Sequence, residues 1–395
     1  MKIIEGGITA PKGFTSGGVH CGIKYRNKDL SLIYSKAPCL GCGLFTQNKV
    51  QAAPVKITRA HLKNNKAQAI IANSGNANCC TGEQGLKDAR RICKVVADKL
   101  GISPSDVLVA STGIIGKRLP MERMEKAIPA LLDRLSNERS LEAAHAIMTT
   151  DTKPKQISVE LNLGSAKVRI GAIAKGAGML QPHLATMLAF ISTDAKIDKT
   201  RLQKALKEAV DNSFNLITVE GDTSTNDMVL MLANGLSGNK KLNAKEFMLF
   251  QQALNFVCLS LAKMLIKDAE GATKFAQIKV EQAKNITQAK QVAFKVANSA
   301  LVKTALFGSN PNWGRIAAAA GCADSAIKAD RLDIYLDGLK VLQKGVVSKV
   351  DRQRLNESFK KDEIEIKINL GLGKSATRVF TCDLSGKYVK INARY

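Results

Sequence analysis

Short apolar, β-branched runs alternate with longer amphipathic stretches along most of this chain. Short runs of apolar and β-branched residues predict strands at Val55–Thr58, Ala69–Ala72 and Val107–Ala110. Between them, Gly85–Leu100 carries its apolar residues three or four positions apart, which predicts a helix with one buried face. Pro120–Leu135 also has a helical pattern, with Pro120 near its start, and a kink or a break is expected at Pro129.

The same alternation continues to the end of the chain. Alternating apolar residues on either side of Leu163-Gly164-Ser165 predict a hairpin of two strands, Ile157–Leu163 and Ala166–Ile173. Further on, the pattern predicts two helices and then two strands: Asp198–Ser213, Ala244–Lys267, Thr377–Cys382 and Tyr388–Ile391. Strands mixed with helices throughout indicate a mixed α/β fold.

The charge of the chain is its most unusual bulk property. Its 395 residues include 59 Lys and Arg against 34 Asp and Glu, a formal net charge of +25, and 45% are hydrophobic, enough for a large core. A nucleic-acid-binding protein is therefore one hypothesis. The basic excess is spread over both halves, however, and only 5% of residues are aromatic, which favours a solvated basic surface that can steer small anions.

Cysteine usage and the first residues indicate a reduced, cytoplasmic protein. Nine cysteines is an odd number, and Met1–Gly7 has no apolar core of a signal peptide. Cys39 and Cys42 form a single CxxC, which predicts a buried thiol pair more readily than a four-ligand zinc site. The adjacent Cys79-Cys80 are interpreted as packing residues. The four histidines are too scattered for a metal motif, and no stretch resembles the roughly 18 apolar residues of a membrane span.

One segment suggests chemistry directly. Lys175–Leu188 places an internal threonine, Thr186, after a glycine-rich turn and directly behind Ala185. A threonine hydroxyl at such a position can attack the preceding carbonyl, and hydrolysis of the resulting ester would cut the chain. The new N-terminal Thr186 would then carry both a nucleophilic hydroxyl and a basic α-amine. Alternatively, the segment is a buried loop or strand start that happens to contain a hydroxyl residue.

Four further segments combine small and polar residues where apolar runs end, and each would be a plain turn if it stood alone. They are Asn73–Asn78, Ser111–Gly116, Glu220–Asp227 and Asn310–Arg315, the last with the only tryptophan. Considered together, they are strand ends of the kind where functional sites are commonly built.

These motifs resemble those of the ornithine acetyltransferase (ArgJ) family, in the same order and over nearly the whole chain. The resemblance is carried by Gly6–Pro11, Leu44–Asn48, Ala52–Val55, Asn73–Asn78, Ser111–Gly116, Thr149–Thr152 with Pro154-Lys155, Lys175–Leu188, Ser213–Asn215, Gly221–Asp227, Glu270–Lys274, Pro311–Arg315 and Ile391–Ala393. It implies a mixed α/β fold with sheets sandwiched by helices, of the kind shared with DmpA-like aminopeptidases.

The resemblance also implies a reaction. The chain would cleave itself between Ala185 and Thr186 into an α chain (1–185) and a β chain (186–395), assembled as an α2β2 heterotetramer. Thr186 would take an acetyl group from N2-acetylornithine and pass it to glutamate by a ping-pong route, giving ornithine and N-acetylglutamate. Thr112 and Gly113 would form the oxyanion hole.

Five residues would bind substrate by the same resemblance: Thr149, Lys175, Thr186, Glu270 and Asn392. A lysine suits a substrate carboxylate and a glutamate suits an ammonium such as that of ornithine. From the residues alone, Lys175 would be interpreted as a surface lysine and Glu270 as a helix-end carboxylate.

Several alternatives remain open at this point. No GxGxxG or P-loop pattern occurs, so neither a metal nor a nucleotide cofactor is expected, whereas acetyl-CoA as a second acetyl donor is undecided. An N-terminal-threonine amidohydrolase or aminopeptidase of the same fold would pass the acyl group to water instead. The chain departs from the family twice: it stops at Tyr395, short of a C-terminal hydroxyl residue expected to touch substrate, and it has Asn310 where an aspartate is usual.

Overall fold

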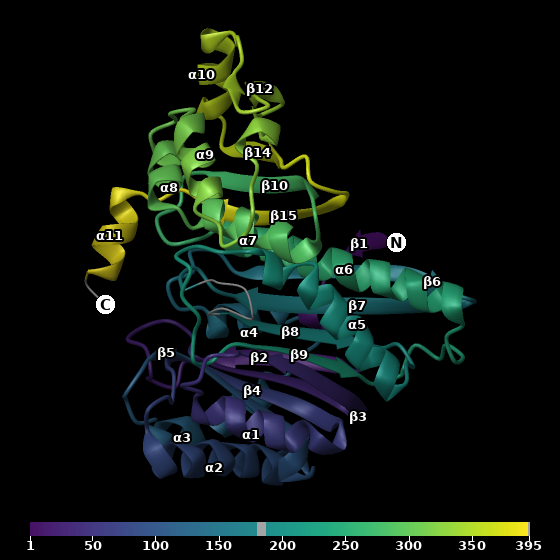
Figure 1. Ribbon diagram of the computed structural model, residues 1–395. Coiled ribbons are helices and arrows are strands. Elements are labelled where there is room, and N and C mark those ends of the chain that lie inside the picture. The colour runs from purple at the N-terminus through teal and green to yellow at the C-terminus, as the bar shows by residue number, and fades with distance from the viewer. Residues whose placement is uncertain (180–186, 394–395) are drawn as a thin grey trace. The chain divides into compact units, whose positions relative to one another are not determined.

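The computed structural model describes residues 1–179 and 187–393 (Figure 1). They divide into two compact units, each described here by itself. Unit 1 contains residues 1–215 and 222–265, and unit 2 contains residues 216–221 and 266–395.

Unit 1 combines a large mixed sheet with helices. In chain order its strands and helices are β1 (Lys2–Ile4), β2 (Phe14–Val19), β3 (Leu30–Phe45), α1 (Ala53–His61), β4 (Lys66–Asn76), α2 (Gly82–Leu100), β5 (Val107–Ile114), α3 (Met121–Asp133), α4 (Ser140–Ile147), β6 (Lys155–Leu163), β7 (Ala166–Lys175), β8 (Leu188–Thr193), α5 (Lys199–Asp211), β9 (Met228–Ala233) and α6 (Ala244–Lys267). Among the described residues the strand order is β1-β6-β7-β8-β9-β3-β4-β5, and β2 pairs with β3 outside this path.

The sheet of unit 1 is buried on both faces. Ile71 and Val109 belong to a core that includes α2 and α3, whereas Ile70 and Leu108 belong to a second core that includes α4. Because neighbouring residues of a strand point to opposite faces, a strand buried on both sides needs an unbroken apolar run. This is why β4 and β5 could be predicted from short apolar runs, and it confirms the expected sandwich of a sheet between helices.

Unit 2 contains a smaller sheet with its own core. Its elements are β10 (Phe275–Ala283), α7 (Ile286–Ala297), α8 (Ala300–Phe307), α9 (Trp313–Gly321), β11 (Asp333–Leu336), β12 (Leu339–Gln343), β13 (Val346–Val347), α10 (Arg352–Lys360), β14 (Glu363–Asn369), β15 (Ser375–Cys382) and α11 (Gly386–Asn392). The strand order is β13-β12-β11-β14-β10-β15. In β14, Ile364, Ile366 and Ile368 are buried in the core, whereas the residues between them are not buried. The strict alternation in β14 is typical of a sheet with one covered face.

Two predicted strands are helical. Val55–Thr58 lies inside α1, where Pro54 occupies the first turn and pre-sets the helical backbone. Tyr388–Ile391 lies inside α11, where Ser385 is the N-cap and its side chain accepts a hydrogen bond from the Tyr388 N–H. Four residues are too few to separate a period of two from a period of 3.6, so the cap and the proline were the better signals.

The other predicted elements are present, with ends that differ by a few residues. The predicted hairpin is β6 and β7, and α3 runs through Pro129 without ending there. By length and composition, α6 passes the test for a membrane span, yet 56% of its most apolar window is buried inside the protein. Its buried residues recur three or four positions apart from Phe250 to Leu265, as in a core helix.

Candidate active site

The ends of the parallel strands β4 and β5 bring two of the predicted motifs together. Ser74 pairs with Thr112 and Gly75 pairs with Gly113. Gly113 has a φ of 131°, and a Cβ atom there would lie 2.3 Å from the carbonyl carbon of Gly75. Only glycine fits this close approach of two backbones, so the backbone N–H of Gly113 is held in a fixed place.

Three residues predicted from the resemblance meet beside this point. Lys175 is the last residue of β7 and only 2% exposed. Its Nζ lies 2.6 Å from Thr149 Oγ1 and 3.3 Å from Thr112 Oγ1. Lys175 is therefore a buried ammonium between two hydroxyls, and the surface lysine expected from the residue type alone is wrong.

The hydroxyls of Thr112 and Thr149 are oriented by this contact. An ammonium group can only donate, so both oxygens accept from Lys175 and their own hydrogens point elsewhere. Among the described residues neither hydroxyl has an acceptor for its hydrogen. Two hydroxyl donors next to a cation suit an oxyanion or a carboxylate.

Asp151 holds this cluster together, and its role was missed from the sequence. Its Oδ1 accepts from Lys155 Nζ and from the Gly176 N–H, both at 2.7 Å. Its Oδ2 accepts from the Thr149 N–H at 3.0 Å and lies 3.8 Å from Lys175 Nζ. One carboxylate thus fixes both Thr149 and the end of β7.

The charge of Asp151 is maintained by its neighbours. Burial alone would raise the pKa of Asp151, but the Lys175 and Lys155 ammonium groups and the Gly176 N–H outweigh it and lower the pKa to about 2. The side chains of Asp151, Lys155 and Lys175 are at most 2% exposed. Because all three are buried, the site contains a net positive charge of one and can accept an anionic group.

Asp227 fixes the chain on the far side of the predicted cut. Its Oδ1 accepts from the backbone N–H of Met187 at 2.8 Å, and its Oδ2 is buried with no hydrogen bond to the described residues. Burial raises the pKa of Asp227 well above its usual range, although the Met187 N–H opposes this shift. Burial at this place therefore favours the protonated form of the carboxyl group over the charged form.

The segment before Asp227 is joined to the same strand ends. Asn226 Nδ2 donates to the carbonyl oxygens of Ala77 and Ser111, at 2.6 and 2.8 Å. The register of the sheet brings the segments on both sides of the predicted cut together. Leu188 at the start of β8 pairs with Lys175 of β7 and with Met228 of β9. Ala185 and Thr186 themselves lie outside the described residues, so the predicted nucleophile and cleavage site stay predictions.

Unit 2 brings the remaining two predicted residues together. Asn392 Nδ2 donates to Glu270 Oε2 at 2.8 Å and to the Tyr388 carbonyl at 3.1 Å. α11 is tied to the Glu270 turn because Ser385 Oγ donates to the Gly271 carbonyl. Asn310, which departs from the family pattern, is exposed, and Trp313, three positions later, packs on the core of unit 2.

Comparisons with known proteins show which family the chain belongs to. The model of the ArgJ family matches residues 15–395. The arginine biosynthesis bifunctional protein ArgJ of Dehalococcoides mccartyi is 47% identical over 396 residues, covering 99% of this chain and 97% of that protein. The crystal structure of the same-named protein from Bacillus halodurans is 38% identical with a TM-score of 0.51, covering 52% of this chain and 98% of that chain.

A further solved structure is an ornithine acetyltransferase from Mycobacterium tuberculosis, complexed with ornithine. It is 39% identical with a TM-score of 0.43 and covers 46% of this chain and 97% of its own. The family model spans nearly the whole chain, and the identity to a curated relative is far above chance. The chain therefore belongs to the ArgJ family.

Proposed function

We propose that this protein is a self-cleaving N-acetyltransferase of arginine biosynthesis, which moves acetyl from N2-acetylornithine to glutamate. The observation that carries the proposal is the meeting of Lys175, Thr112 and Thr149 in one buried cluster, opposite the strand that begins two residues after Thr186. Family membership supplies the reaction class.

Self-cleavage comes first in the proposed sequence of steps. The Thr186 hydroxyl attacks the Ala185 carbonyl, the acyl group moves from nitrogen to oxygen, and water hydrolyses the ester. The products are a carboxylate on Ala185 and a free α-amine on Thr186. That amine, with an ordinary pKa of roughly 8, can take the hydroxyl proton in each later attack.

Acetyl transfer then follows a ping-pong course. Thr186 attacks the acetyl carbonyl of N2-acetylornithine, ornithine leaves, and the amine of glutamate attacks the acetyl-Thr186 ester. Both steps pass through a tetrahedral oxyanion, for which the Thr112 hydroxyl and the Gly113 N–H are the proposed donors. Lys175 is proposed to bind the substrate carboxylate together with Thr149, and Glu270 and Asn392 to bind the ammonium group of ornithine.

The two products of cleavage are proposed to stay associated. β7 ends the first piece and β8 begins the second, and the two strands pair from Ile170 with Thr193 to Lys175 with Leu188. The Bacillus halodurans chain, matched over 98% of its length yet covering only 52% of this chain, supports a cut near the middle. We extend the proposal to an α2β2 assembly of chains 1–185 and 186–395 in the cytoplasm.

The first experiment is the intact mass of the denatured protein beside a Thr186→Ala variant. Two polypeptides, the second beginning at Thr186, together with an uncut variant, are the expected result. A single uncut wild-type chain would overturn the self-cleavage. Light scattering of the native protein then tests the α2β2 mass.

The transfer reaction has its own assay. Ornithine and N-acetylglutamate should appear in equal amounts from N2-acetylornithine and glutamate, without a metal or nucleotide. Ornithine without N-acetylglutamate would identify an amidohydrolase instead. The word bifunctional in the relatives' names supports a second activity, for which we propose acetyl-CoA as donor. Labelled acetyl-CoA that gives no N-acetylglutamate at saturating glutamate would exclude that extension.

A further inference from the structure

Two neighbouring cysteines lie in unit 1, and one of them, Cys80, lines a pocket. Cys79 is buried and Cys80 is exposed, and their sulfur atoms are 3.8 Å apart, close to van der Waals contact. In an extended strand, successive side chains point to opposite faces. Here Cys80 has a φ of 56°, a left-handed conformation that turns its side chain toward that of Cys79. The interpretation of both as packing residues therefore holds for Cys79 alone.

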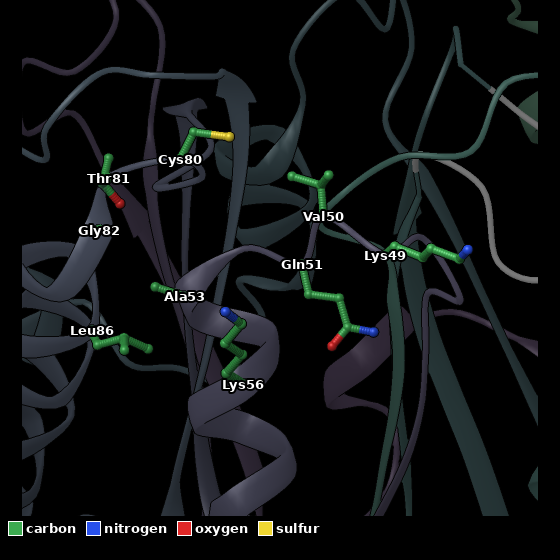
Figure 2. Close-up of a pocket in the computed structure, with 9 residues that line it drawn as sticks. All are labelled: Lys49, Val50, Gln51, Ala53, Lys56, Cys80, Thr81, Gly82 and Leu86. Atoms are coloured by element: carbon green, nitrogen blue, oxygen red, sulfur yellow. The ribbon is translucent and has the colours of Figure 1, made fainter.

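The pocket beside Cys80 has a volume of about 320 Å³ (Figure 2). Its lining includes Lys49 from the segment before α1, Lys56 from α1, and Thr81 and Gly82 at the start of α2. Within the described part of the chain neither lysine ammonium has an ion pair or a hydrogen bond. The Lys56 ammonium and the positive end of a helix favour an anionic ligand next to an accessible thiol. The Lys49 side chain extends away from Cys80 in Figure 2 and adds to the positive charge at the rim of the pocket.

We propose that Cys79 and Cys80 form a modification site that exchanges with anionic low-molecular-weight disulfides and closes to a vicinal disulfide. In the first step the Cys80 thiolate attacks one sulfur of the reagent, so that a mixed disulfide forms and one reagent thiolate leaves. In the second step the Cys79 thiolate attacks the Cys80 sulfur and expels the other. The cysteine pair loses two electrons and two protons, and the reagent is reduced to two thiols.

The geometry makes the product reversible. Consecutive Cα atoms are 3.80 Å apart, below the usual range of about 4.4–6.8 Å for disulfides. The sulfur atoms must also approach by about 1.8 Å to reach a bond length of 2.03–2.05 Å. A bond closed under such constraint stores strain and is reduced readily, as labile disulfides are.

Formation of the Cys79–Cys80 disulfide should affect the backbone of the candidate active site. The carbonyl oxygen of Cys79 accepts from the Gly116 N–H at 2.9 Å, and the Ala77 N–H donates to the Ile114 carbonyl at 3.0 Å. These bonds lie on both sides of the turn that follows Gly113. We expect closure of the eight-membered ring to shift the backbone of Cys79 and Cys80, and so to disturb the Gly116 bond and the backbone that presents Gly113.

Other cysteines of the same chain serve as controls for the reactivity of Cys80. Cys39 and Cys42 are both buried, and burial raises the pKa of each to about 12. Burial raises the pKa of Cys79 as well, but Cys79 contacts the exposed Cys80, whereas among the described residues neither Cys39 nor Cys42 has a sulfur contact with an exposed cysteine. Cys322 is exposed, and no other cysteine of the described residues is paired with it. It should therefore stop at the mixed disulfide.

The test treats the full, self-processed protein with glutathione disulfide, which is anionic, or with cystamine, which is cationic. Peptide mapping should find a loss of two hydrogens on the peptide containing Cys79 and Cys80, and a stable glutathione adduct on Cys322. At low salt we expect Cys80 to prefer the anionic reagent roughly tenfold more than Cys322 does. The double variant with Lys49→Gln and Lys56→Gln should lose that preference, and high salt should remove it from the wild type.

Two variants separate the steps. Cys79→Ser should keep the glutathione adduct on Cys80, and Cys80→Ser should leave Cys79 unmodified. Acetyl transfer by the wild type should fall on closure and return with dithiothreitol, whereas Cys80→Ser should be insensitive. A wild-type protein in which Cys80 carries only a mixed disulfide, or which shows the same charge preference at Cys80 and Cys322, would overturn the proposal, whatever the acetyl-transfer assay shows.

Discussion

Asp227 accepts a hydrogen bond from the backbone N–H of Met187, the residue directly after the proposed nucleophile. The contact spans 40 positions of the chain and joins the start of β8 to the start of β9. It fixes one side of the bond that is proposed to break. The carboxyl group is buried and its pKa is raised, which favours the neutral form of this anchor.

Replacing Asp227 should show that the anchor, and not a charge, is needed. Asp227→Asn keeps an oxygen for the Met187 N–H, and we expect near-normal cleavage. Asp227→Ala leaves that N–H unsatisfied, which should cost about 1–3 kcal/mol and slow the cleavage markedly. Urea denaturation and a time course of chain cleavage measure the two effects. Equal cleavage rates in both variants would contradict the anchoring role.

Asp227 should make the protein less stable as the pH rises, which is opposite to the effect of a carboxyl group whose pKa is lowered by folding. A carboxyl whose pKa is raised by folding binds its proton more tightly when folded, so its contribution falls as pH rises above the ordinary range near 3.9. Asp227→Asn cannot ionise. Its free energy of unfolding relative to wild type should therefore increase between pH 4 and pH 7, and a constant difference would show that Asp227 does not titrate this way.

Asp151 should behave in the opposite sense. Its pKa is lowered to about 2, so its stabilisation is fully present above pH 4 and is lost as pH falls toward 2. Asp151→Asn leaves the buried Lys155 and Lys175 uncompensated, which should cost about 3–5 kcal/mol. The exposed pair of Lys94 and Asp98 is a matched control, and Asp98→Asn should cost below about 1 kcal/mol.

Gly113→Ala should be damaging for a steric reason. The added Cβ would meet the Gly75 backbone at 2.3 Å, and φ is 131°. We expect a loss of stability of more than about 2 kcal/mol and a large fall in kcat. Gly116→Ala is the control, since its φ of 82° is also unfavourable but no atom outside its neighbours lies within 4 Å. Similar losses in both variants would point to backbone conformation alone.

Thr112→Val tests the oxyanion role of the hydroxyl. The change keeps the shape of the side chain and removes the donor, so kcat for acetyl transfer should fall about 10²–10³-fold with a smaller change in KM. The β5 strand should stay intact, because Thr112 pairs through its backbone. Circular dichroism and the unfolding midpoint check this. Unchanged kcat would remove Thr112 from the proposed mechanism.

Much of the fold was accessible from the sequence because burial imposes periodicity. Two-sided burial produced the apolar runs of β4 and β5, and one-sided burial produced the helical pattern of α2. The short runs in α1 and α11 failed because four residues fit either period. In each of those two cases the deciding residue, Pro54 or Ser385, stands at the start of the element.

The residues of the candidate site could be predicted from the sequence in a different way. Lys175, Thr149 and Thr112 were found through ordered motifs, since nothing local marks Lys175 as buried. Asp151 lies inside one of those motifs but was given no role, because its partner Gly176 is 25 positions away and only the fold brings the two together. The same holds for Asp227, whose partner Met187 lies 40 positions away in the Lys175–Leu188 motif.

The pairing of β7 with β8 has a consequence for how the mature protein regains its structure. If the bond before Thr186 is broken, the covalent link between these strands is lost while their hydrogen-bonded ladder remains. Folding then changes from a unimolecular process into an association of two chains, whose yield depends on concentration. Cleavage of this kind is therefore irreversible for folding. The uncut precursor is a single chain that can refold from dilute solution, whereas the two denatured chains of the cleaved enzyme must first associate with each other.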